Sequence, residues 1–329
     1  MESFALLLLL TGVNLGYARL GKTQCFQTNA ELRSAVKNYV KTNGTDSTIA
    51  KTYGYPIGSW CVNDVTDFNH VFYHMLTFNE DISEWSVGSG TNFSHMFDTA
   101  ESFDQRLDHW DMSQAQDLSF MFSGALHFTN ENYPLTWNTS QVTDLTCTFQ
   151  GSNYQAPLDS WDVSSVTSLY GTFIMSSFNS NIGNWDVSRV TNMQDTFSES
   201  RFNQDIGNWK TSNVVNMAHM FDWNEKFDQD ISRWDTSNVE TMEGMFFLAS
   251  SFNQDISRWN VGKAQNTNSM FESSGFYQNL CSWGPQLAMT NETKSVDLLD
   301  MFVETLCPFV KDPSLTITPA GPFCYLCIS

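Results

Sequence analysis

Apolar residues recur along most of the chain with a period close to 25 residues. Ten tryptophans fall 24 to 27 residues apart, and two aromatic series that begin at Phe72 and Phe78 follow in the same phase. A fixed period of this length is typical of repeat proteins, whose copies bury their apolar faces against one another. The tryptophan series is Trp60, Trp85, Trp110, Trp137, Trp161, Trp185, Trp209, Trp234, Trp259 and Trp283.

The copy at residues 185–208 predicts a short strand followed by a short helix. Trp185 and Val187 are two residues apart, as on one face of a strand. Ser188 is a preferred helix N-cap, and the spacing of Val190, Met193 and Phe197 indicates one helix face. The sequence therefore predicts an α/β repeat solenoid of about ten coils, each with one parallel strand and one short helix.

The ends of the chain differ from the repeats. An apolar run at residues 4–10 is followed by Gly16 and Ala18 and predicts a signal peptide over residues 1–18; an apolar terminal strand or helix is the alternative. We expect an N-terminal cap at 19–54, with a helix in AELRSAVKNYV, then the repeat array at 55–305 and a C-terminal cap at 306–329. No other stretch is long and apolar enough to span a membrane.

The charge balance excludes some partners. The chain has 16 basic and 36 acidic residues, a net charge of −20. Nucleic acid and anionic membrane surfaces are therefore not expected partners, because both attract Lys and Arg. With 41% hydrophobic residues the chain is expected to build a core and not to be disordered.

Six of the seven cysteines lie near the two ends, which predicts caps stapled by disulfides. We expect Cys25 to pair with Cys61, and two further bridges among Cys281, Cys307, Cys324 and Cys327, whose three possible pairings stay open. A zinc site or a redox motif at the C-x-x-C pair is the weaker alternative. Cys147 is expected to be a buried free thiol. The glycosylation sequons are at Asn43, Asn92, Asn138 and Asn291.

No arrangement of residues indicates catalysis. The sequence contains no recognisable nucleophile motif, phosphate loop or zinc-protease motif. We therefore expect no enzyme activity and no cofactor. His70, His95 and His219 share one repeat position and are expected to be ordinary surface histidines.

Two columns of polar residues are candidate binding residues. The residue after each tryptophan is predicted to face outward as an acidic binding face, with turn chemistry near a helix start as the alternative. The second column consists of Asp205, Asp230 and Asp255, which are weak candidates for binding Ca²⁺ between coils; the alternative is that they cap backbone amides of turns. The first column consists of Asp111, Asn138, Asp162, Asp186, Lys210, Asp235 and Asn260.

The repeat contains the phrase FNQDI at 202–206 and 252–256, WDVSRVTNM at 185–193, and a recurrent Met-Phe pair. These phrases resemble those of the BspA-like leucine-rich-repeat surface proteins. The resemblance implies leucine-rich-repeat-like coils and a secreted or cell-surface protein. It also implies adhesion for some members. We expect a module that binds an extracellular protein or glycan, and because the outward column is mainly acidic, the partner should carry positive charge or be bridged by a divalent cation. A structural extracellular glycoprotein without a specific ligand is the alternative.

Overall fold

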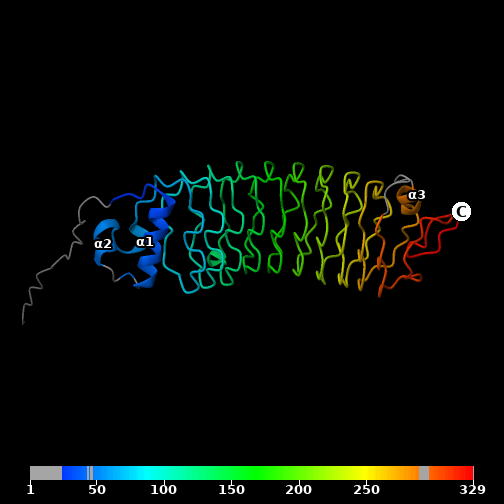
Figure 1. The fold of residues 1–329 in the computed structure, drawn as a ribbon. Helices are drawn as coiled ribbons and strands as arrows, with labels where there is room; N and C mark the ends of the chain where they lie inside the picture. The colour runs from blue at the N-terminus through cyan, green and yellow to red at the C-terminus, as the bar shows by residue number, and fades with distance from the viewer. Residues whose placement is uncertain (1–23, 43, 45–46, 289–295, 329) are drawn as a thin grey trace, which may run out of the picture.

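The computed structural model describes residues 24–42, 44, 47–288 and 296–328. The chain winds into one row of stacked coils (Figure 1). Two helices, α1 (Asn29–Lys41) and α2 (Ser47–Tyr53), lie at one end, and α3 (Trp283–Ala288) lies near the other. Two 3-10 turns, η1 (Ile57–Ser59) and η2 (Asn130–Asn132), complete the regular elements. The predicted signal peptide lies outside the described residues.

The predicted α/β repeat solenoid is wrong. In the described residues, no coil has a strand at its tryptophan, and only the last tryptophan of the series, Trp283, begins a helix, α3. Neighbouring coils are joined instead by nine single-residue parallel bridges, from Asp67↔Asn92 to Asn266↔Asp297. Each coil is therefore a series of turns, and the coils hold one another in place.

The segment that was predicted to be helical forms the contact between coils. Backbone N–H groups of alternate residues donate to the next coil, as from Phe72 to the Met96 carbonyl at 2.9 Å. The residues between them donate within their own coil to a carbonyl three residues back, as from Met75 to Phe72 at 3.1 Å. These three-residue turns place Val190, Met193 and Phe197 inside with the spacing of a helix face.

Two residues per coil, four positions apart, adopt the left-handed conformation, with φ between 52° and 64°. Most are not glycine, although this conformation costs other residues about 1–2 kcal/mol. The hydrogen bonds between coils offset that cost. The pairs are 70/74, 95/99, 120/124, 147/151, 171/175, 195/199, 219/223, 244/248, 269/273 and 300/304. The coil surface that carries these residues is called the ladder face below.

The tryptophans join the coils from inside. From Trp85 to Trp259 each indole N–H of the series donates to a backbone carbonyl about one coil back, as from Trp209 to Ile182 at 3.1 Å and from Trp234 to Ile206 at 3.0 Å. Beside them, the phenylalanine series from Phe72 to Phe302 stacks with ring centroids 5.3–5.7 Å apart. Buried apolar side chains form one continuous core along the stack.

The recurrent FNQDI phrase is a hydrogen-bonding unit between coils. The Asn203 side-chain oxygen accepts from the Asp228 backbone N–H at 3.1 Å and from the Gln229 amide at 2.9 Å. Asp228 does the same for Asn253 and Gln254 in the following coil. The phrase therefore recurs because in each coil its side-chain oxygen accepts the corresponding backbone N–H of the next coil.

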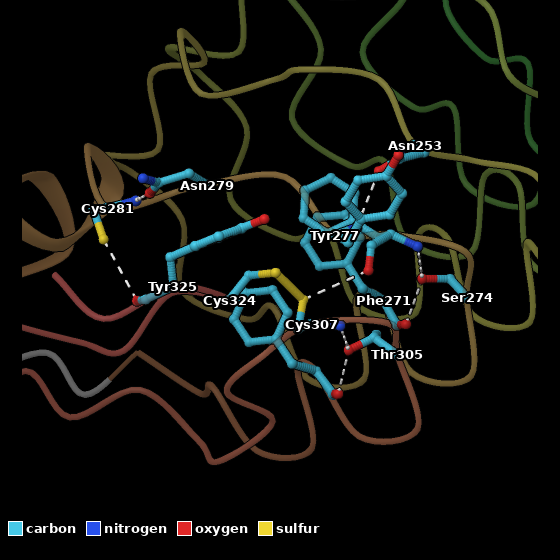
Figure 2. The surroundings of a disulfide bond; sticks show 12 residues. Asn253, Phe271, Ser274, Tyr277, Asn279, Cys281, Thr305, Cys307, Cys324 and Tyr325 are labelled. Atoms are coloured by element: carbon cyan, nitrogen blue, oxygen red, sulfur yellow. Dashed lines mark hydrogen bonds between the residues drawn. A yellow bond between two sulfur atoms is a disulfide. The ribbon is translucent and has the colours of Figure 1, made fainter.

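Both ends carry the caps that such a stack needs. The predicted N-terminal helix is confirmed as α1, which buries Leu32, Val36 and Tyr39 against the first coil. Cys25 is bonded to Cys61 behind it. At the other end Cys281 pairs with Cys327. Cys307 pairs with Cys324 (Figure 2). Cys147 is a buried free thiol, and burial raises its pKa to about 12.

The indole hydrogen bond predicts unequal effects for two tryptophan substitutions. Trp209→Phe removes one of two donors to the Ile182 carbonyl, which keeps the Trp185 backbone N–H, and leaves a cavity beside it, so we expect a loss of about 1–3 kcal/mol in unfolding free energy. Trp223→Phe is the control, because Trp223 is 54% exposed and lies outside the core. Its effect should stay within about 0.5 kcal/mol. Urea unfolding of both variants measures the difference, and equal losses would contradict this role for the indole.

Gly90 predicts a rescue experiment. A Cβ at Gly90 would lie 2.4 Å from the Phe93 ring, which stacks on Phe68. Gly90→Val should therefore cost about 1–3 kcal/mol through overpacking. Adding Phe93→Leu recreates the Val142 and Leu145 pair of a later coil and should recover part of the loss. Thermal unfolding tests this, and a double variant less stable than Gly90→Val would refute it.

Candidate binding surfaces

The predicted acidic column is exposed, but its residues build turns and not a sheet face. Asp186 accepts the Ser188 backbone N–H at 3.2 Å, and Asp235 accepts that of Ser237 at 3.0 Å. Hydrogen bonding by the serine hydroxyl and then its backbone N–H lowers the pKa of both carboxyls. The same turn occurs at Asp111, Asn138, Asp162 and Asn260. Turn formation therefore accounts for the repetition of acids in this column.

Asp205, Asp230 and Asp255 lie at a second corner of the coils. Their carboxylates accept the backbone N–H groups of Gly207, Ser232 and Ser257, each at 2.9 Å. No group of three or more histidines, cysteines or acids suited to hold a metal ion occurs among the described residues. The structure thus gives these aspartates the turn-capping role, and nothing in their geometry calls for Ca²⁺.

The ladder face carries exposed residues that sequence reasoning did not bring together. Met175, Glu199 and Trp223 occupy the same position in three successive coils, and Met175 and Trp223 are 49% and 54% exposed. Together with Asp195 and Asp222 they form what is called the central patch below. Trp223 stood out in the sequence as the tryptophan outside the series, and only the stacking of coils reveals its neighbours.

Charged groups in the central patch are partly buried. The Nδ1 atom of His219 lies 3.2 Å from the Asp222 carboxylate but is poorly aligned for a hydrogen bond. This contact with Asp222 raises the pKa of His219, against the opposing effect of burial. Burial raises the pKa of Asp195. The Oδ1 atom of Asp222 is buried with no hydrogen-bond partner among the described residues, which leaves an acceptor beside an exposed indole.

The remaining predicted surface sites differ in accessibility. Asn138 is exposed, whereas Asn92 is half-buried and accepts the Ser94 backbone N–H at 3.0 Å. Asn43 and Asn291 lie outside the described residues. Within the described chain, no helix has both the length and the apolar character needed to cross a membrane.

Two histidines at the same repeat position should titrate in opposite directions. Contact with Asp222 raises the pKa of His219, whereas burial and then the charges of His95 and Arg33 lower that of His70. NMR titration of the ring protons should place His219 above and His70 below the usual value of about 6.5. Asp222→Asn should lower the pKa of His219 and leave His70 unchanged. Identical titration of both rings would contradict the described contacts.

Since a folded-state pKa above the unfolded value stabilises the protein below that unfolded value, the contribution of His219 should be complete at low pH. It should be lost as the pH rises through the pKa of the folded state. The unfolding free energies of the parent and of Asp222→Asn at pH 5.5 and 8.5 measure this contribution. The difference between parent and variant should be larger at pH 5.5, and a larger difference at pH 8.5 would contradict the prediction.

Comparison with known proteins gives one family. The family model described as "Mycoplasma protein of unknown function, DUF285" matches residues 45–153, 134–206 and 198–304 in three overlapping segments. No curated protein and no solved structure matched the chain. The matches cover the coil stack from its N-terminal cap almost to its last coil, and the chain belongs to this DUF285 family.

Proposed function

We propose that this protein is a secreted or cell-surface binding module that contacts a protein or glycan partner without turnover. The observation that supports this most is the central patch, where exposed Met175, Glu199 and Trp223 lie in successive coils at a position whose residue differs from coil to coil. Regular columns are explained by packing and turns. A contiguous set of exposed residues that no repeat rule requires favours selection for contact with a partner.

The chemistry of the central patch suggests the character of the partner. An exposed tryptophan is typical of residues that dominate binding energy in interfaces. Asp195, Glu199 and Asp222 surround it with acidic groups. We therefore propose a partner that presents an apolar group within a positively charged surface, or one that is bridged by a divalent cation.

Three disulfides support a place outside the cytosol, because such bonds persist in oxidising compartments. The signal peptide expected at residues 1–18 agrees with this proposal. We further propose that the chain is a BspA-like protein and that adhesion is its biological role. The repeat phrase that it shares with that family holds neighbouring coils together here.

The acidic column is the second candidate surface. Asp111, Asp162, Asp186 and Asp235 are exposed on successive or near-successive coils, so their carboxylates remain open to an extended cationic partner even while they accept turn hydrogen bonds. A structural extracellular glycoprotein remains the alternative function, with Asn138 as its accessible glycan site.

One binding experiment separates these proposals. The mature chain is screened against glycan and surface-protein arrays, and Trp223→Ala is then compared with the triple variant Asp162→Asn, Asp186→Asn and Asp235→Asn. We expect Trp223→Ala to weaken binding to the identified partner by about 2 kcal/mol, a typical value for an interface anchor. The triple variant should fold, because Asn keeps the turn acceptor, as at Asn138. Binding should also weaken as salt increases.

The possible outcomes lead to different conclusions. Loss of binding in the triple variant alone would make the acidic column the site and overturn the assignment to the central patch. Absence of any partner on either array would favour the structural glycoprotein.

A further inference from the structure

A groove of about 990 Å³ lies between α1 and the first coil. One wall carries Arg33, Lys37 and Lys41, which are four residues apart and share one helix face. The other wall carries Tyr73 between two histidines. None of its described lining residues is acidic, although acids outnumber bases by 36 to 16 in the whole chain. The groove is therefore a basic site on an acidic protein.

The cations of α1 are not used by the fold. In the described part of the chain, neither Arg33, Lys37 nor Lys41 forms an ion pair with an acidic group. All three are exposed, while Leu32 and Val36 on the opposite helix face attach α1 to the core. The basic row can thus be changed without removing the contacts that hold the helix.

The opposite wall offers ring faces and hydrogen-bond acceptors. The Tyr73 ring lies 4.7 Å from the His70 ring and 4.1 Å from the His74 ring, and Tyr73 is 38% exposed. In later coils, the backbone carbonyls of this row accept hydrogen bonds from the preceding coil, and the first coil has no coil before it. Asn29 donates to the carbonyls of Asp67 and Asn69 at 3.0 and 2.8 Å, whereas those of Val71 and Tyr73 have no partner among the described residues.

We propose that this groove binds an acidic saccharide, an oligosaccharide that carries carboxylate or sulfate groups. Charges one helix turn apart, roughly 6 Å, suit a linear ligand with repeated negative groups. Sugar hydroxyls can donate to open carbonyls, and the C–H face of a sugar ring packs against an aromatic ring. The site is separate from the central patch and does not depend on the function proposed there.

An acidic peptide fits this edge less well. A peptide in extended conformation presents N–H and C=O groups alternately along its edge. The coil edge presents only carbonyls in this row, because its N–H groups donate either to the next coil or, as at Val71 and Tyr73, within the first coil. Half of the peptide groups would therefore face a carbonyl, whereas the hydroxyls of a saccharide can all donate.

The test uses the disulfide-bonded full chain and a heparin hexasaccharide as the probe, measured by isothermal titration calorimetry. Arg33→Gln with Lys37→Gln should weaken binding roughly tenfold or more, as expected for lost hydrogen bonds to charged groups. Lys210→Gln with Arg233→Gln removes the same charge elsewhere and should change affinity less than about twofold. Tyr73→Leu should also weaken binding, and Trp223→Ala should not.

Further probes separate the ligand classes. Equal binding of hexaglutamate that is lost in the same double variant would assign the groove to acidic peptides and overturn the saccharide. If millimolar inorganic sulfate alone abolished heparin binding as fully as the double variant does, the groove would be a general anion-binding surface and the saccharide proposal would be overturned. Unchanged heparin binding in Arg33→Gln with Lys37→Gln overturns the site itself. Should that variant unfold, Lys37→Gln with Lys41→Gln makes the same test, since it also leaves the buried face of α1 intact.

Discussion

The stack depends on a row of hydrogen bonds between coils, from Phe68 to His74 and at the matching positions of later coils, that run in one direction. In each coil alternate backbone N–H groups donate to carbonyls of the next coil, as from His95 to Ser119 at 2.9 Å. In an ordinary parallel sheet a strand both donates to and accepts from each neighbour. Here two left-handed residues per coil turn the donors to one side and the acceptors to the other. The tryptophan bonds, which also cross between coils, follow the same repeat and so lock the register.

This one-way pattern makes the two ends of the stack chemically different. The first coil is left with unpaired carbonyls, two of which are satisfied by the Asn29 amide of α1. The last coil has N–H groups in the same row, at Leu298, Asp300, Phe302 and Glu304, which have no acceptor among the described residues. In this row, therefore, the first coil offers acceptors and the last coil offers donors. The helical N-terminal cap supplies a donor through Asn29, whereas no described residue of the disulfide-bonded C-terminal tail accepts from the open N–H groups.

Much of the organisation could be predicted from the sequence, but the coil conformation could not. The aromatic period defined the repeats, and the helix of the N-terminal cap was evident from its own periodicity. The spacing of Val190, Met193 and Phe197 was assigned to a helix because three-residue turns with left-handed residues produce the same spacing. Those left-handed residues include His219, Trp223 and Leu248, so no glycine pattern reveals them. The acidic column was located correctly as exposed, whereas the central patch depends on contacts between coils that no single copy contains.

A repeat of this kind separates structural residues from residues that are free to bind. Asp186 and Asn203 recur because each satisfies a backbone group in a fixed place, so their repetition carries little information about a ligand. Trp223 satisfies no such group with its exposed side chain, and Arg33 belongs to a cap that the repeat does not constrain. The two proposed sites are therefore found where the repeat rule ends, on the ladder face and at the first coil. Their opposite charges imply different ligands, because a cationic surface that suits the central patch would be repelled by the basic groove.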